Sequence, residues 1–136
     1  MRIDSVRAVP LTWQLPEGGH KWWSDYGPRT ESHAIIVEVK TDDGLVGYGE
    51  VHPGYGRTQG ACHTAKAIVE KELGPEIMGE DASRPEYVWE KMYNGPRTEL
   101  ALTYGHACPR LGRRGMTVCA MSGIDMALWD VFAQSL

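Results

Sequence analysis

The last stretch of the chain, residues 116–136, sets the strongest constraint on how this sequence can fold. It reads MTVCAMSGIDMALWDVFAQSL and contains no Lys, Arg or Glu, so that Asp125 and Asp130 are its only charges. On a helix, one apolar face is formed by Met121, Ile124, Leu128, Val131 and Phe132. The face beside it carries the small residues Ala120, Gly123 and Ala127. Much of the remaining surface of the helix is covered by Val118, Trp129 and Ala133. Because a helix that is apolar most of the way round is buried on several sides, we expect a partner to cover it, either another subunit or a continuation of the chain.

Three observations argue against a membrane or secreted protein. Each aspartate at mid-helix would cost about 2.5–3.5 kcal/mol in a bilayer, so we expect no membrane span. The opening residues, MRIDSVRAVPL, mix acidic and basic side chains and do not resemble a signal peptide. Three cysteines without CxxC spacing predict neither a disulfide scaffold nor a structural zinc site, and they favour a cytoplasmic location.

Length and charge further limit the class of protein to which this chain can belong. A chain of 136 residues with 42% hydrophobic content fits one domain with a modest core. The net charge is -4, and the one basic cluster (Arg110, Arg113 and Arg114) is short and lacks alternating aromatics. We therefore expect no nucleic-acid partner.

The first third of the chain predicts antiparallel strands. Val9, Leu11 and Trp13 alternate in an opening strand, in which Pro10 favours an edge position. Residues 33–41 and 45–50 predict two more strands, joined by a hairpin at 42–44 in which Gly44 can take a positive φ. Two Gly- and Pro-containing loops, 15–32 and 51–58, adjoin strand ends; we expect no regular structure in the first, and both could lie near one edge of the sheet.

Helices follow the strands. An apolar stripe formed by Ala61, Ala65, Ile68, Val69 and Leu73 predicts a helix that stops at Gly74-Pro75. Ser83 and Glu86 predict a capping box that opens a helix ending near Asn94, with Val88, Trp89, Met92 and Tyr93 on its buried face. The predicted fold class is therefore α+β, a three-stranded antiparallel meander followed by a helical bundle.

Several motifs carry little chemistry. The segment GYGEVHPGYG (47–56) has His52 where a GxGxxG motif needs its third glycine, and no GK[ST] follows, which argues against nucleotide binding. The histidines and glutamates lack metal-ligand spacing such as HxxxH, so we expect no metal ligand. Asp125 and Asp130 point in different directions on the helix, and we interpret Asp125 as a buried, hydrogen-bonded structural acid. We find no candidate catalytic residue in this chain.

The loop HKWWSDYG (20–27) offers the clearest candidate binding residues. One interpretation is that its aromatic side chains anchor the loop on the sheet or form a subunit contact. The other is that the loop is a lid whose aromatic side chains stack on a ligand, while His20, Lys21 or Arg29 attracts an anion. In the second loop, His52 and Tyr55 are either polar groups satisfied at a strand end or part of the same pocket. The candidate substrate-binding residues are His20, Lys21, Trp22, Trp23, Tyr26, His52 and Tyr55.

The order of elements, the strand ending VGYGE and the segment GRRGMTVCAMSGIDMALWD together resemble the N-terminal capping domain of the enolase superfamily, mandelate racemase/muconate lactonizing enzyme type. The closing segment resembles the branch that contains mandelate racemase and the sugar-acid dehydratases. The resemblance covers essentially the whole chain. It implies a capping α+β domain over residues 1–115 and a final helix, 116–136, that leads toward a (β/α)₇β barrel missing from this sequence.

The resemblance also implies a chemistry. Such enzymes remove the proton next to a carboxylate, and Mg²⁺ stabilises the enediolate that forms. The base and the Mg²⁺ ligands belong to the barrel, so the Mg²⁺ of the full enzyme would be bound by residues not present in this chain. The implied role of the loops at 20–26 and 52–55 is to close over the barrel and contact the distal part of the substrate.

We therefore expect the capping domain of an enzyme acting on a small hydroxy- or sugar-acid, with dehydration preferred over racemisation or epimerisation, and inactive without its barrel. We also expect a homo-oligomer. Two alternatives stay open: a non-catalytic module that self-associates through the final helix, and a small-molecule binding protein that uses HKWWSDYG without chemistry. Binding of apolar dyes by the final helix and Trp fluorescence with added sugar acids would distinguish them.

Overall fold

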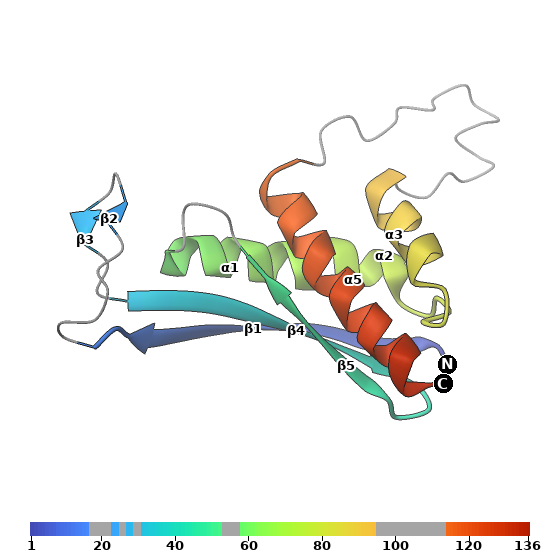
Figure 1. The fold of residues 1–136 in the computed structure, drawn as a ribbon. Coiled ribbons are helices and arrows are strands. Elements are labelled where there is room, and N and C mark those ends of the chain that lie inside the picture. Colours follow the sequence, from blue (N-terminus) through green and yellow to red (C-terminus); the bar gives the residue numbers. More distant parts are fainter. Residues whose placement is uncertain (17–22, 25–26, 29–30, 53–57, 95–113) are drawn as a thin grey trace, which may run out of the picture.

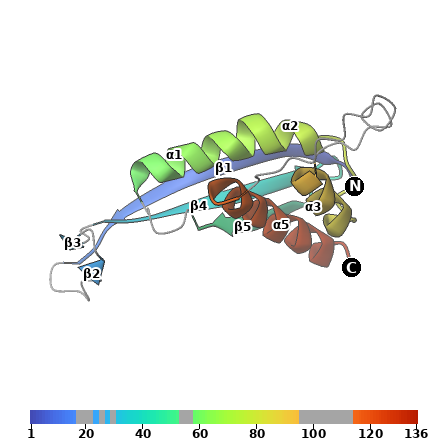
Figure 2. The ribbon, with the colours of Figure 1, turned by 90° about the horizontal axis from the view of Figure 1, so that it is seen from above.

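The computed structural model describes residues 1–16, 23–24, 27–28, 31–52, 58–94 and 114–136. It has two layers, an antiparallel sheet and a set of helices that all lie on one face of that sheet (Figure 1 and Figure 2). The strands are β1 (Ile3–Gln14), β4 (Glu31–Thr41) and β5 (Val46–Val51), hydrogen-bonded in the order β1-β4-β5. The predicted α+β class and three-stranded meander are confirmed.

The hairpin between β4 and β5 is formed as predicted. Gly44 has a φ of 94°, in the region that residues with a Cβ rarely adopt. Its amide donates to the carbonyl oxygen of Thr41 at 3.0 Å, and the amide of Leu45 donates to the Thr41 hydroxyl at 3.0 Å. The turn fixes the register in which Val37 lies opposite Gly49.

Strict alternation along β4 separates the two faces of the sheet. Ile35, Val37 and Val39 are fully buried beneath the helices. On β1, the predicted alternating residues Leu11 and Trp13 point the other way and are 44% and 47% exposed. The core therefore lies between one face of the sheet and the helices, and the opposite face is left open by the described elements.

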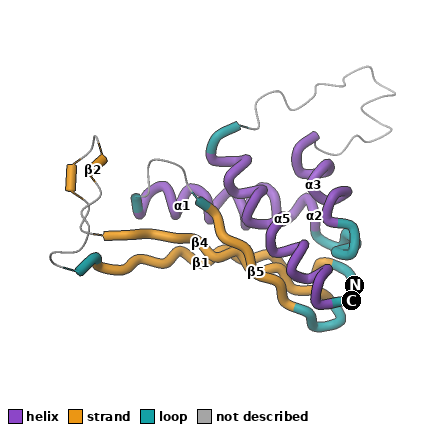
Figure 3. The backbone as a smooth tube through the Cα atoms, in the orientation of Figure 1, coloured by secondary structure: helices purple, strands orange, loops and turns teal. Residues whose placement is uncertain are grey.

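The helices are α1 (Gln59–Ala67), the π-helix η1 (Ile68–Leu73), α2 (Gly74–Ile77), α3 (Pro85–Asn94) and α5 (Met116–Gln134). The first three follow one another without a break, as the continuous coil in Figure 3 shows. The prediction that this helix stops at Gly74-Pro75 is wrong. Pro75 falls in the first turn of α2, where its missing amide costs little, and the amide of Gly74 bonds to the Val69 carbonyl in the wider π-turn.

Helix α3 ends at Asn94 as predicted, but its start and its buried face differ from the prediction. The Ser83 hydroxyl donates to Asp81 Oδ1 at 2.7 Å, so it does not act as the expected cap. Val88 and Met92 are buried, whereas Tyr93 is 46% exposed. Tyr93 lies one residue beyond Met92, which turns its ring toward the edge of the buried stripe.

Helix α5 packs against β5 at unusually short range because glycines face each other. A Cβ on Gly47 would stand 2.0 Å from the carbonyl oxygen of Ala127, and one on Gly123 would stand 2.5 Å from Val51 Cγ2. The glycines of the GYGE segment thus give the helix room to lie on the strand, a packing role rather than a nucleotide-binding one. The face predicted to be buried is confirmed except at Phe132, which is only half-buried.

Side chains from the helices also cover both edges of the sheet. On β5, Asp130 Oδ2 accepts from the Tyr48 amide at 2.9 Å, and Gln134 Nε2 donates to the Val46 carbonyl at 2.8 Å. On β1, the Ala8 amide donates to Glu70 Oε1 at 3.0 Å, and Lys66 Nζ donates to the Ala8 carbonyl at 2.8 Å. The backbone groups at the middle of each edge strand are thereby satisfied.

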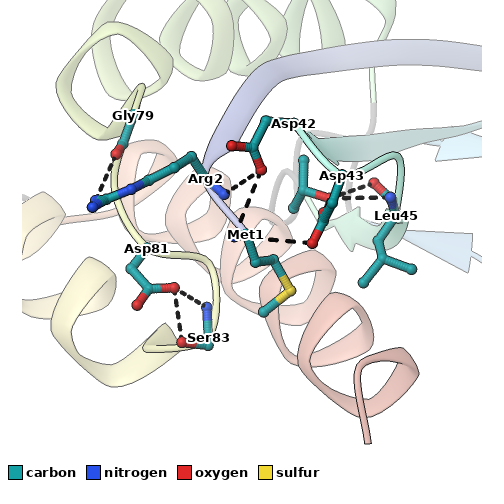
Figure 4. A network of polar contacts seen from close by, with 9 residues as sticks. Met1, Arg2, Asp42, Asp43, Leu45, Gly79, Asp81 and Ser83 are labelled. Atoms are coloured by element: carbon teal, nitrogen blue, oxygen red, sulfur yellow. Dashed lines mark hydrogen bonds and ion pairs between the residues drawn. The ribbon is translucent and has the colours of Figure 1, made fainter.

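A polar network closes the end of the sheet that carries the hairpin (Figure 4). Asp42 Oδ1 accepts from the Arg2 amide at 2.7 Å and lies 3.6 Å from the Met1 amine. The Arg2 guanidinium donates to the Gly79 carbonyl at 3.2 Å. The hydrogen bond from the Arg2 amide is the main cause that holds the pKa of Asp42 below its ordinary value. These polar contacts occupy the end of the sheet that carries the hairpin. A binding site at the strand ends would therefore lie at the opposite end of the sheet.

Candidate functional site

The two candidate loops adjoin strand ends that lie at one end of the sheet, opposite the hairpin. Gln14, the last residue of β1, pairs with Glu31, the first residue of β4. Val51, the last residue of β5, pairs with Ile35, four residues further along β4. Segments 15–30 and 52–58 therefore adjoin neighbouring strands at the same end of the sheet, as the sequence predicted.

The first of these segments is not wholly irregular, which corrects a prediction. Trp23–Ser24 (β2) pairs antiparallel with Gly27–Pro28 (β3), and β4 already begins at Glu31. This small two-stranded sheet lies beyond the end of β1 and β4 (Figure 1). The prediction was based on the content of Gly and Pro in this segment. Strand pairing is made by backbone groups, so this content does not exclude a short pair of strands.

Most of the predicted binding side chains fall outside the part of the chain that the structure describes. His20, Lys21, Trp22, Tyr26 and Tyr55 are in this group. Trp23 is described through its backbone alone, as part of β2. His52 is described: it directly follows β5 and its side chain is exposed.

A polar cluster that the sequence analysis missed lies at the base of the first loop. The His33 side chain is 6% exposed and its Nδ1 lies 2.9 Å from Thr12 Oγ1. Its Nε2 lies 3.7 Å from Glu31 Oε2, and Gln14 Nε2 donates to Glu31 Oε1 at 2.7 Å. The alternation in HAIIVEVKT places His33 on the face of Ile35, so the pattern contained the signal. The cluster ties the last residues of β1 to the first residues of β4, from which the loop leaves.

Among the described residues, no group of three or more His, Cys, Asp or Glu side chains could hold a metal ion. These residues therefore do not fit a Mg²⁺ site, and we assign no step to a metal in this part of the chain. Cys62 is buried, and burial raises the pKa of its thiol, which favours the inert thiol over the reactive thiolate.

The role expected for Asp125 is not the one that the structure shows. Asp125 is half-buried, burial raises its pKa, and it has no hydrogen-bond partner among the described residues. The hydrogen-bonded structural acid is Asp130, on the edge of β5. Asp125 instead lies on the outward face of α5 near Met126 and Trp129, each 44% exposed.

By length and composition, α5 is the one helix among the described residues that could cross a membrane. Seven of its residues are buried in the core, however: Ala120, Met121, Gly123, Ile124, Ala127, Leu128 and Val131. Packing of this kind against β5 and β4 is that of a core helix with one uncovered apolar face.

Comparison with known proteins places residues 24–136 in the family model described as "Mandelate racemase / muconate lactonizing enzyme, N-terminal domain". The chain is 35% identical over 100 residues to an arabinonate dehydratase from Saccharolobus solfataricus, covering 74% of this chain and 22% of that protein. It is 33% identical over 131 residues to a D-galactarolactone cycloisomerase from Agrobacterium fabrum, covering 96% of this chain and 29% of that protein.

A similar solved structure is that of a racemase from Streptomyces coelicolor A3(2) with bound magnesium. It matches with a TM-score of 0.68 and 27% identity, covering 95% of this chain and 31% of that one. The chain thus spans less than a third of the length of these relatives.

Proposed function

The chain belongs to the mandelate racemase/muconate lactonizing enzyme family, as its N-terminal domain, and on that premise we propose that it is the capping domain of an enzyme that removes the proton next to the carboxylate of a sugar acid. The domain would shape the part of the site that contacts the distal end of the substrate. The base that takes the proton would lie in a following barrel domain, which makes residues 1–136 inactive alone.

One observation carries this proposal. The end of β1, the start of β4 and the end of β5 place Gln14, Glu31 and Val51 at the same end of the sheet, so that both candidate loops leave the sheet at that end. The residues proposed to contact the substrate are His20, Lys21, Trp22, Trp23, Tyr26, His52 and Tyr55. Their cationic, hydrogen-bonding and aromatic groups suit a carboxylate and a chain of hydroxyl groups.

Dehydration is the preferred reaction, supported by the likeness to an arabinonate dehydratase. In that reaction the proton next to the carboxylate passes to a base and the electron pair of its C–H bond forms a C=C bond. The neighbouring C–O bond breaks, its hydroxyl leaves as water with one added proton, and the enol that results becomes a 2-keto acid. Such a step needs proton transfer by groups near their working pKa, which we place outside this chain.

Racemisation or epimerisation is the second candidate, favoured by the likeness to a racemase and to a cycloisomerase. Both reactions share the first proton transfer with dehydration and differ in whether a proton returns to the same carbon. A non-catalytic module that self-associates through α5 is a further candidate, because Met126 and Trp129 on that helix are exposed.

Mg²⁺ would supply charge stabilisation to the full enzyme. Because the described residues offer no suitable group of ligands, we propose that the ion is held by residues of the barrel domain. The contribution of this chain is then binding, orientation and exclusion of water at the substrate's distal end.

Domain exchange tests this function. Residues 1–136 would replace the matching N-terminal part of the arabinonate dehydratase, and kcat/KM would be measured for sugar acids of different length and stereochemistry. We expect an active chimera whose substrate preference departs from that of its parent, and whose KM for longer acids rises when His52 is changed to Ala. A folded, active chimera with the parent's preference throughout would contradict the proposal.

A further inference from the structure

At the end where the candidate loops leave it, the described part of the sheet is two strands wide. β5 stops at Val51, which pairs with Ile35, whereas β1 and β4 stay paired as far as Gln14 and Glu31. We call residues 11–14 and 31–34 the "arm"; it extends toward β2 and β3 (Figure 1). A two-stranded ribbon is marginally stable in water on its own, and the Gln14 side chain is exposed. The direction of the arm therefore depends on contacts between its own side chains.

Polar side chains link the two strands of the arm in a chain of contacts. His33 Nδ1 on β4 lies 2.9 Å from Thr12 Oγ1 on β1. On the other side of the ring, Nε2 lies 3.7 Å from Glu31 Oε2, and Glu31 Oε1 accepts from Gln14 Nε2 at 2.7 Å. With its proton on Nε2, the ring directs an N–H toward the Glu31 carboxylate while Nδ1 accepts from the Thr12 hydroxyl. The contacts thus cross between the strands twice, once at His33 and once at Glu31.

His33 ends an apolar row on β4. Ile35, Val37 and Val39 on the same face are fully buried, and the His33 side chain is itself 6% exposed. A valine or leucine at this position would extend the core, whereas a buried imidazole needs hydrogen-bond partners to offset its lost hydration. What the imidazole adds is direction, because hydrogen bonds have preferred distances and angles that apolar contacts lack.

The start of β4 limits where the β2–β3 strand pair can lie. Three peptide bonds join Pro28, the last residue of β3, to Glu31, the first residue of β4. Their Cα atoms can therefore be at most about 11 Å apart. Trp23, one of the residues proposed to contact the substrate, pairs with Pro28. A shift at the start of β4 is thus passed to Trp23 through a short covalent link.

We propose that His33 is a positioning residue for the substrate site. Through Thr12 and Glu31 it holds the two strands of the arm together, and so holds the β2–β3 pair, with Trp23, at a fixed orientation to the sheet. Its role in substrate binding rests on the proposed function, whereas its effect on orientation does not. Because His33 acts through other residues, its loss should weaken substrate binding without slowing the chemical step.

The orientation can be measured on residues 1–136 without a substrate. Residual dipolar couplings of the Trp23 and Ser24 amides would be compared in wild type, His33→Leu, Thr12→Val and Thr12→Ser. Leucine extends the apolar row and valine matches the shape of threonine, so both changes remove the hydrogen bond with little change in packing. In these two variants we expect the couplings to fall by roughly half, as the strand pair reorients more freely. Thr12→Ser keeps the hydroxyl and should keep the wild-type couplings.

Kinetics of the chimera with the arabinonate dehydratase test the role in substrate binding. We expect His33→Leu and Thr12→Val to raise KM for the sugar acid by roughly three- to tenfold, with kcat unchanged. The matched control is Arg7→Gln, because Arg7 pairs with Glu38 at 3.3 Å between the same two strands but outside the arm. This variant should leave both the couplings and KM as in wild type.

Two results overturn the proposal. One is that His33→Leu and Thr12→Val both keep the wild-type couplings. The other is that the couplings fall but KM does not rise, in a chimera whose substrate preference differs from that of its parent. A chimera that keeps its parent's preference would instead contradict the proposed function, and the couplings would still decide whether His33 positions the β2–β3 pair.

Discussion

Gly49 on β5 lies so close to Gly123 on α5 that a Cβ on Gly49 would stand 2.0 Å from the Gly123 carbonyl oxygen. Real Cβ atoms do not approach a backbone oxygen so closely, and neither the strand nor the helix can move without disturbing the core. The contact holds β5 and α5 together, and with them the strand end from which the second candidate loop begins.

Gly49→Ala should therefore destabilise the domain strongly. We expect a loss of about 3 kcal/mol or more in the free energy of unfolding, because the added methyl group overpacks a backbone contact. Urea unfolding followed by circular dichroism measures it. Gly60→Ala is the control, since a Cβ there meets only Thr58 Oγ1 at 3.9 Å, and a helical Ala should be neutral or stabilising. Equal stability of both variants would refute the close packing.

The two aspartates of α5 should respond in opposite directions to substitution. Asp130→Ala removes the acceptor for the Tyr48 amide and should cost about 1.5–3 kcal/mol, the range for a hydrogen bond to a charged group. Asp125→Asn removes a charge that burial disfavours and should stabilise the domain at neutral pH. Amide exchange at Tyr48 should speed up in the first variant only; no change there would show that Asp130 does not protect the strand edge.

Glu70 should make part of the stability depend on pH. Burial raises its pKa, but the hydrogen bonds from Lys66 and from the Ala8 amide outweigh burial and hold the pKa below its ordinary 4.5. A lowered folded pKa means that this stabilisation is present above pH 4.5 and is lost as pH falls through the lower folded value. Unfolding experiments from neutral to acidic pH should show a flatter profile for Glu70→Gln. The exposed Glu86, changed to Gln, should keep the wild-type profile.

The outward face of α5 should bind apolar dyes in the isolated chain. Trp129 is 44% exposed and stacks edge-on against Phe132, with ring centroids 5.8 Å apart. Trp129→Lys should lower the fluorescence of bound 1-anilinonaphthalene-8-sulfonate by breaking this apolar patch. Tyr87→Lys is the control, because Tyr87 is 43% exposed but lies on α3. An equal decrease in both variants would mean that the dye does not report on α5.

The fold could be predicted from the sequence where local pattern and tertiary packing agree. Alternation in residues 33–41 and Gly44 in the turn gave the β4–β5 hairpin, and helical spacing gave the buried face of α5. The prediction failed at Gly74-Pro75, because the Gly74 amide bonds to the Val69 carbonyl in a π-turn and Pro75 falls in the first turn of α2, where no amide is needed. It also failed at Ser83, whose hydroxyl finds Asp81 instead of the helix.

The candidate site could be predicted only in its placement. The adjoining strand ends follow from antiparallel pairing, which the sequence pattern shows. His33 was missed because it occupies one position in a strand of alternating buried and outward-facing residues, where it has no distinct pattern of its own. Its contact with Thr12 depends on the register of β1 against β4. The sequence within a single strand does not contain that register.

Deuterium incorporation next to the carboxylate of a sugar acid, measured by NMR in D₂O with Mg²⁺, tests most directly whether the chemistry lies outside this domain. It would be followed for residues 1–136 alone and for the chimera with the arabinonate dehydratase barrel. The account predicts incorporation by the chimera and none above background by the isolated chain. Incorporation catalysed by residues 1–136 alone would contradict it, because the base would then belong to this chain.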